Sequence, residues 1–255
     1  MFQVQYSAAE SIGQPPAVRG SQSAQVLRTR PLASNICFSH APTARSLTMF
    51  GLLPPVTRAL LIANTAVFVA QFAIGGFLVQ HCALWPPNLA GQYGLRGAGT
   101  FEIWQLVTYA FLHGSPMHLA FNMLALFMFG RELERTWGGE RFLIYYFVCI
   151  VGAAIAQLVV VSVHGGRPYP TIGASGGVFG VLLAYGMLFP RRMILLIFPP
   201  IPMPAWVFVT LYGVIELVLG VTGTQAGVAH FAHLGGMASG FVLIRYWRYQ
   251  SRRRW

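Results

Sequence analysis

Long apolar segments recur along this chain, with arginines between them. The segments cover about 58–80, 116–131, 141–162, 172–190, 204–222 and 229–246. At about 1.5 Å per residue, a helix of about 20 apolar residues crosses the hydrocarbon core of a bilayer. Only 9% of the residues are charged, whereas soluble domains carry roughly 25%. The sequence therefore predicts an all-α membrane protein built as a bundle of six transmembrane helices.

The arginines are distributed unevenly between the two sides of the predicted bundle. If the N-terminus is cytoplasmic, the outer loops contain only Arg96 and Arg167. The cytoplasmic segments then contain Arg58, Arg131, Arg135, Arg141, Arg191, Arg192 and the arginines from Arg245 to Arg254. Because cytoplasmic loops carry an excess of arginine, we predict that both termini are cytoplasmic. The same bias accounts for the net charge of +11 in a chain embedded in lipid, and we expect no nucleic-acid partner.

The N-terminal residues differ in composition from the rest of the chain. Residues 1–48 are polar and contain several arginines but one acidic residue, Glu10. Three interpretations stay open: a targeting segment, a flexible tail, or a natural start at Met49. We assign this segment no catalytic role. The predicted domain covers 49–247, and a basic cytoplasmic tail covers 248–255.

A serine surrounded by glycines opens the fourth apolar segment, in the sequence GASGG centred on Ser175. We interpret Ser175 as a nucleophile. His233 lies about one turn into the sixth segment, and His118 and Asn122 lie in the first two turns of the second. These helices all begin on the outer side, so the four residues fall within about 10 Å of one membrane level. Polar side chains inside a membrane are costly unless they are paired or functional, which favours a site.

This set of residues fits nucleophilic catalysis. A serine hydroxyl needs a base, and His233 is suited to accept its proton. A carboxylate that orients the histidine would complete a triad; the chain has no aspartate, and Glu216 is the glutamate well inside a segment. A Ser175–His233 dyad is the more economical interpretation, and the absence of lysine excludes a Ser-Lys pair. Free N–H groups at a helix N-terminus, with His118 and Asn122, would stabilise the oxyanion.

Metal and cofactor sites are not predicted. The chain has three cysteines, without CxxC or other metal-ligand spacing: Cys37, Cys82 and Cys149. The chemistry above needs only side chains and water, so we expect no cofactor.

Glycines keep one side of the fourth and sixth segments bare. They are Gly173, Gly176, Gly177 and Gly180 in the fourth, and Gly235, Gly236 and Gly240 in the sixth. Small residues let two membrane helices approach closely, and Gly236 to Gly240 form a GxxxG motif. Helix packing alone is the common explanation of such a motif. Here a close approach would also bring Ser175 and His233 within hydrogen-bonding distance, which favours the catalytic interpretation.

Together, GASGG around Ser175, AHLGG around His233 and the HxxxN pair of His118 and Asn122 resemble the rhomboid family of intramembrane serine proteases. The resemblance covers about 50–250, with the motifs in the family's order. It implies that Ser175 is the nucleophile and His233 the base, and that His118, Asn122 and the Ser175 N–H form the oxyanion hole. It also implies single-span membrane-protein substrates and a simple bacterial form in the inner membrane.

The predicted function is hydrolysis of peptide bonds in or near transmembrane segments. We expect substrates to enter sideways, between the second and fifth segments, and to unwind locally, because a helical peptide bond is shielded by its own hydrogen bonds. A transporter would be expected to contain inverted repeats or broken helices, and none is apparent. A catalytically silent rhomboid-like protein that binds membrane clients is the other alternative, although that class loses the serine or the histidine.

Several other polar residues have simpler interpretations. His113 is expected to be a hydrogen-bonded loop residue near the mouth of the site. His230 could compete with His233 as base, but it lies at the outer edge of its helix. Glu216 is expected to face a wet cavity or to bond a neighbouring helix, and Glu134 is read with Arg141 as an ordinary cytoplasmic charge. In the loop before the second segment, Trp104-Gln105 stands where the family commonly has Trp-Arg.

Overall fold

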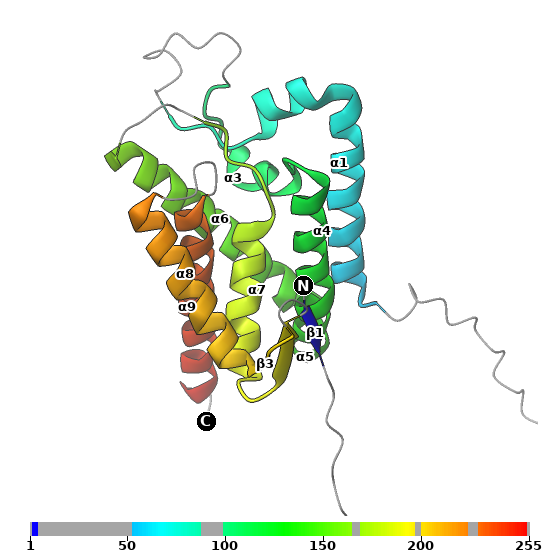
Figure 1. Cartoon of the computed structure of the whole chain (residues 1–255), viewed down its shortest axis with the longest axis vertical. Helices are drawn as coiled ribbons and strands as arrows, with labels where there is room; N and C mark the ends of the chain where they lie inside the picture. Colours follow the sequence, from blue (N-terminus) through cyan, green and yellow to red (C-terminus); the bar gives the residue numbers. More distant parts are fainter. Residues whose placement is uncertain are drawn as a thin grey trace, which may run out of the picture.

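Helices dominate the computed structural model, which describes residues 2–4, 53–87, 99–164, 169–196, 200–223 and 229–253. The helical elements are α1 (Pro55–Cys82), α3 (Gln105–Thr108), the 3₁₀ turn η2 (Tyr109–Phe111), α4 (Pro116–Ala125), the π-helical turn η3 (Leu126–Gly130), α5 (Arg131–Trp137), α6 (Gly139–His164), α7 (Ser175–Leu188), α8 (Ala205–Thr222) and α9 (His230–Arg253). In Figure 1, α7 lies in the middle, with α6, α8 and α9 on one side and α4 and α1 on the other.

Each predicted apolar segment falls on a helix, which confirms the helical part of the prediction. By length and hydropathy, three of the described helices are able to cross a membrane: α1, α6 and α8. In the most apolar window of α1 only 6% of the residues are buried. A helix that is apolar all round and yet exposed to this extent is stable only when lipid covers it.

The boundary of the second segment differs from the prediction. The second segment was expected to end near residue 131, but α4, η3 and α5 follow one another without a break as far as Trp137. Helix continues because Glu132 pairs with Arg135 one turn later at 3.3 Å and with Arg192 at 3.1 Å. Gly138, with φ of 84°, then ends the helix.

A buried carboxylate from α5 holds the first turn of α1. Glu134 Oε1 accepts a hydrogen bond from the Val56 N–H at 2.8 Å. Its Oε2 accepts from the N–H and the hydroxyl of Thr57, both at 2.7 Å. The interpretation of Glu134 as an ordinary cytoplasmic charge is therefore wrong, since only 4% of its surface is exposed. The free N–H groups and the positive dipole end of α1 attract the carboxylate.

The central helix α7 packs against α9 through backbone rather than side chains. Nine of its 14 residues are buried. A methyl group on Gly236 of α9 would overlap the carbonyl oxygen of Gly176 on α7. Only glycine permits this approach, so the close packing predicted from the glycine pattern is confirmed.

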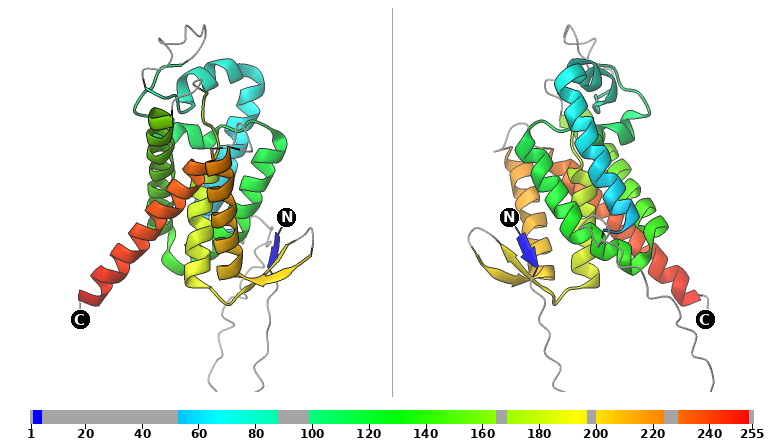
Figure 2. Two further views of the ribbon diagram at one scale, coloured as in Figure 1. Left: turned by 60° about the vertical axis from the view of Figure 1, so that its left-hand side comes forward. Right: turned by 90° about the vertical axis from the view of Figure 1, so that its right-hand side faces the viewer.

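A small sheet lies beside the end of α8, which the all-α prediction did not include. β2 (Met193–Leu196) and β3 (Pro202–Pro204) form an antiparallel pair, and β1 (Phe2–Val4) pairs antiparallel with β2. Figure 2 shows this sheet at the same end of the bundle as the C-terminus of α9. Proline is tolerated in β3 because β3 is an edge strand. Residues 5–52 lie outside the described part, so the interpretations of the N-terminal segment and the domain limits stay predictions.

Candidate active site

Ser175 is the first residue of α7, at the point where an extended segment turns into the helix. Gly173, two residues earlier, has φ of 128°, which residues with a side chain rarely adopt. Its N–H donates to the Tyr109 carbonyl at 3.0 Å, and Tyr109 is itself fixed by a hydrogen bond from its hydroxyl to the Ile150 carbonyl at 2.9 Å. The turn is thus anchored, and it leaves the first N–H groups of α7 around Ser175 without helical partners.

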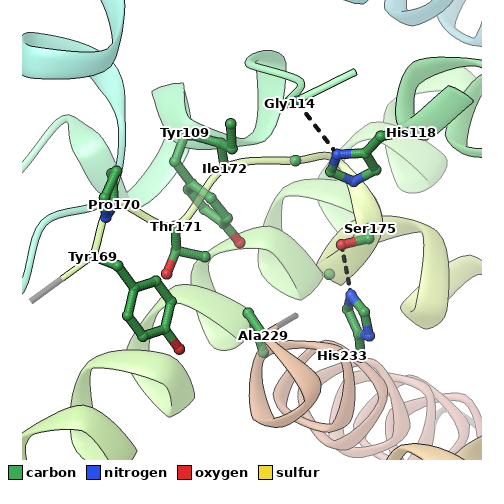
Figure 3. A pocket seen from close by; sticks show the side chains of 13 residues that line it. Tyr109, Gly114, His118, Tyr169, Pro170, Thr171, Ile172, Ser175, Ala229 and His233 are labelled. Carbon is green, nitrogen blue, oxygen red and sulfur yellow. Dashed lines mark hydrogen bonds between the residues drawn. The ribbon is translucent and has the colours of Figure 1, made fainter. Parts of the chain in front are cut away.

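His233 of α9 reaches the serine directly. Its Nε2 lies 2.7 Å from Ser175 Oγ, and Figure 3 shows this hydrogen bond across the pocket. The Phe179 ring, one turn after Ser175 on α7, stacks on the imidazole at 4.3 Å between centroids and 7° between planes. The imidazole is therefore held on one face by an aromatic ring while its edge points to the hydroxyl.

His118 of α4 lies on the other side of Ser175, as Figure 3 shows. The Ser115 hydroxyl caps α4 by accepting from the His118 N–H at 3.1 Å. The Gly114 N–H donates to His118 Nδ1 at 3.5 Å. Because Nδ1 accepts, the neutral ring carries its hydrogen on Nε2. A side chain on Gly173 would collide with this end of the ring, so Nε2 is directed toward the turn that precedes Ser175.

Asn122 lies one turn beyond His118 on the same face of α4 and is 5% exposed. Among the residues that the structure describes, its amide Nδ2 has no hydrogen-bond partner. A buried donor without a partner is unfavourable, by roughly 1–3 kcal/mol. Such a donor is suited to a negative oxygen that is present only during a reaction.

Glu216 of α8 approaches two histidines of α9. Its Oε2 lies 2.6 Å from His230 Nδ1 and 2.9 Å from His233 Nδ1. All three residues are buried, and the expectation that Glu216 bonds a neighbouring helix is confirmed. Their ligand-type atoms lie within 4.8 Å of one another, and carboxylate and imidazole are groups that zinc accepts. However, both nitrogens approach one oxygen at hydrogen-bond and ion-pair distances, so the carboxylate already has partners.

A cavity of about 680 Å³ opens beside Ser175. Figure 3 shows the segment from Tyr169 to Ile172 along its wall, with Ser175 and His233 at one end. The wall segment is fixed by a two-bond bridge between Leu84 and Thr171, with N···O distances of 3.0 Å in both directions. The cavity has room for several residues of an extended peptide, and the nucleophile is accessible from it.

Two glutamines secure the loops around this cavity. Gln71 of α1 forms two hydrogen bonds with the backbone of His113. It accepts from the His113 N–H at 2.9 Å and donates to the His113 carbonyl at 3.2 Å. The prediction of a hydrogen-bonded His113 is correct for this backbone, whereas its buried ring nitrogens lack partners among the described residues. Gln105 accepts from the Trp85 N–H at 3.1 Å and donates to the Thr100 carbonyl at 2.8 Å. The neutral Gln105 amide therefore holds this loop by hydrogen bonds, at the position where the rhomboid family commonly has an arginine.

A family model described as the Rhomboid domain matches residues 100–250, more than half of the chain. The chain belongs to the rhomboid family. Putative rhomboid protease YdcA of Bacillus subtilis is 30% identical to this rhomboid over 198 residues, 77% of this chain and 89% of that protein. Rhomboid protease GlpG of Yersinia pestis is 27% identical over 214 residues, 82% of this chain and 66% of GlpG.

Other relatives match over a smaller part of their length. Rhomboid protease GluP of Bacillus subtilis is 34% identical over 142 residues, 55% of this chain and 25% of GluP. RHOMBOID-like protein 4 of Arabidopsis thaliana is 35% identical, and the match covers 33% of it. This rhomboid thus spans a third or less of these two proteins. Family membership and the exposed apolar helices together make it an integral membrane protein of a serine protease family.

One contact of the site, that of Phe179 with His233, was not predicted from the sequence of this rhomboid. The Phe179 ring follows Ser175 by four residues, and that spacing on a helix was an available signal for a residue on the same helix face as Ser175. Glu216 was named from the sequence as the glutamate that could orient His233, although the dyad was preferred, and its Oε2 lies 2.9 Å from His233 Nδ1. An acid in such a segment is costly without a partner, and this cost was the available signal.

Proposed function

We propose that this rhomboid is an intramembrane serine endopeptidase of a bacterial inner membrane that cuts single-span membrane proteins. We further propose six membrane crossings, with both termini in the cytoplasm. The observation that carries the proposal is the 2.7 Å hydrogen bond between Ser175 Oγ and His233 Nε2, contributed by two helices and open to a cavity. This distance is within the range in which a base activates a nucleophile.

The first half of the reaction forms an acyl-enzyme. Ser175 Oγ attacks the carbonyl carbon of the substrate peptide bond while its proton passes to His233 Nε2. The carbonyl electrons move to oxygen, and the negative charge is stabilised by His118 Nε2–H, the Asn122 amide and the N–H at the start of α7. When the carbonyl re-forms, the C–N bond breaks and His233 returns the proton to the leaving amine.

The second half of the reaction uses water that enters through the cavity. His233 accepts a proton from the water as its oxygen attacks the ester carbon, and the same donors stabilise the second oxyanion. The C–O bond to Ser175 then breaks, and His233 returns the proton to Oγ. A shared set of groups therefore serves both halves, so loss of either Ser175 or His233 blocks turnover.

The length of α7 supports chemistry below the membrane surface. Its 14 residues span about 21 Å, less than the roughly 30 Å of a bilayer core. The arginines after its last turn, Arg191 and Arg192, favour the aqueous boundary at that end, so Ser175 at the other end falls short of the opposite surface. We propose that substrates enter sideways between α4 and α8. Substrates with Gly or Pro near the outer end of their helix should be cut best, because they unwind readily.

The proposal is tested by cleavage of a model single-span substrate by purified protein in liposomes. Wild type, Ser175→Ala and His233→Ala are compared with Ser162→Ala, which removes an exposed hydroxyl on α6. We expect wild type and Ser162→Ala to cut at equal rates and the two site variants to be inactive. Equal cleavage by wild type and Ser175→Ala would reject Ser175 as the nucleophile.

Labelling with a fluorophosphonate separates the remaining outcomes. If wild type cuts no substrate but Ser175 is labelled, the serine is activated and the model substrate was the wrong one. If wild type neither cuts the substrate nor is labelled at Ser175, the protein is the client-binding alternative, and the proposed protease function is wrong. The Ser162→Ala variant must be labelled like wild type for either conclusion to hold.

A further inference from the structure

Glu216 is buried beneath the proposed Ser175–His233 pair without a cationic partner of the usual kind. It is 8% exposed, and its ion-pair partners among the described residues are His230 and His233, with no arginine. A carboxylate at this depth in an apolar helix is costly unless its neighbours compensate it. This arrangement therefore calls for an explanation beyond helix packing, which an apolar side chain would serve better.

The position of Glu216 matches the role of an orienting acid. The two ring nitrogens of His233 face different partners: Nε2 lies 2.7 Å from Ser175 Oγ, and Nδ1 lies 2.9 Å from Glu216 Oε2. An ionised carboxylate only accepts hydrogen bonds, so it favours the hydrogen on Nδ1. The lone pair is then on Nε2, where the Ser175 hydroxyl can donate to it.

We propose that Glu216 is a positioning residue for His233 and that the site of this rhomboid works as a Ser-His-Glu triad. This inference rests on the proposed protease function and deepens it. The contact between Glu216 and His233 has an ion-pair distance without the alignment of a hydrogen bond. Its main effect is therefore on charge: it is strongest when His233 has taken the serine proton and carries a positive charge, as in the transition state.

His230 has a supporting function in this arrangement. Its Nδ1 lies 2.6 Å from the same Oε2, a distance at which an N–H donates a strong hydrogen bond to a carboxylate. His230 is the first residue of α9 and lies three positions before His233. It fixes the carboxylate on the Nδ1 side of His233, while the Phe179 ring covers one face of the imidazole.

The test compares Glu216→Gln and Glu216→Asp with wild type and Ser175→Ala in the liposome cleavage assay. The matched control is Glu134→Gln, which alters another buried carboxylate, one that caps α1 outside the site. We measure kcat and KM for cleavage, the rate of fluorophosphonate labelling of Ser175, and the Tm in detergent. The amide has the same size as the carboxylate but no charge, so it removes the proposed effect with little change in packing.

The expected result is a loss in kcat of about 10²-fold or more for Glu216→Gln, with KM within about twofold of wild type. Labelling of Ser175 should slow in parallel. Glu216→Asp keeps a carboxylate, so its kcat should be at least about tenfold higher than that of Glu216→Gln. Glu134→Gln should lower Tm while kcat of the folded protein stays near that of wild type.

Three outcomes would overturn the inference, and they are distinguishable from failure of the proposed function. Wild-type kcat and labelling in Glu216→Gln, with Ser175→Ala inactive, would reject the triad and leave the dyad in place. If Glu216→Gln has both a lower Tm and a lower activity, and Glu216→Asp recovers neither, Glu216 has a structural role. If wild type neither cleaves nor is labelled at Ser175, the protease function fails, and the positioning role fails with it.

Discussion

At the scale of single residues, the candidate site contains a hydrogen-bond donor that we propose acts on a transient negative oxygen. This donor is the amide of Asn122, whose Nδ2 is buried and has no partner among the described residues. In a stable core such a group is normally satisfied. In the proposed mechanism, this donor lowers the stability of the resting protein and stabilises the oxyanion during the reaction.

We predict that Asn122→Ala lowers kcat by about 10²–10³-fold with little change in KM, because the donor acts on the oxyanion and not on the bound substrate. The measurement is the rate of substrate cleavage in liposomes. Asn64→Ala is the control: it removes a buried amide that donates to the Leu60 carbonyl on α1 at 2.8 Å. It should reduce Tm and leave kcat near wild type. A wild-type kcat in Asn122→Ala would exclude this donor.

Residue identity alone indicated most of the candidate site. Ser175, His233 and His118 could be selected from the sequence because polar residues are rare in apolar segments, and all three line one cavity. Whether Glu216 reaches His233 could not be decided in this way, and the sequence favoured a dyad. Spacing along α8 does not fix how α8 is rotated against α9, and a rotation of one residue, about 100°, would turn the carboxylate away from His233.

At the scale of elements, the approach of α7 to α9 decides whether the two proposed catalytic side chains meet. The backbones are so close at Gly176 and Gly236 that a side chain has no space between them. The distance between α7 and α9 is therefore short because neither glycine has a side chain. The hydrogen bond between Ser175 and His233 depends on this short distance, although neither glycine takes part in the reaction.

We predict that Gly236→Ala destabilises the protein by about 1–3 kcal/mol, because the added methyl forces α7 and α9 apart. Cleavage should fall along with Tm, since Ser175 Oγ and His233 Nε2 would move apart. Gly76→Ala is the control, on exposed α1, where an added methyl meets no atom within 4 Å. It should leave Tm and cleavage unchanged or raise Tm slightly. Equal Tm and activity for Gly236→Ala and wild type would contradict the prediction.

The contact between α5 and α1 leads to a second prediction at this scale. Glu134→Ala leaves the N–H groups of Val56 and Thr57 without their acceptor and should cost about 2 kcal/mol. Thermal unfolding in detergent is the measurement. Glu140→Ala, at an exposed position in the first turn of α6, should change stability by less than about 0.5 kcal/mol. A similar Tm for both variants would show that water replaces Glu134 at no cost.

Helices were predictable at this scale and the sheet was not. Apolar length is sufficient to locate a membrane helix, because lipid leaves the backbone few other structures. The strands β2 and β3 are short, and prolines at Pro202 and Pro204 oppose a strand assignment unless the strand is known to be an edge. The extension of α5 was missed because ion pairs with Glu132 offset the cost of its charges.

At the scale of the whole molecule, the distribution of arginine predicts the orientation. We expect alkaline phosphatase fused after residue 255 to be inactive, because the C-terminus is predicted to be cytoplasmic and the phosphatase folds only outside. Fusion after residue 166, in a predicted outer loop, should be active. Both fusions are measured in cells at equal expression. An active phosphatase at the C-terminus would invert the topology.

The proposed catalytic atoms come from helices far apart in the chain, and His233 follows Ser175 by 58 positions. Synthesis at about 5–20 residues per second places a delay of about 3–12 s between the two. During that interval the nascent chain carries its serine but not its base, and α9 is still missing from the bundle. If the proposed function holds, we expect the protein to be inactive until α9 has been inserted beside α7.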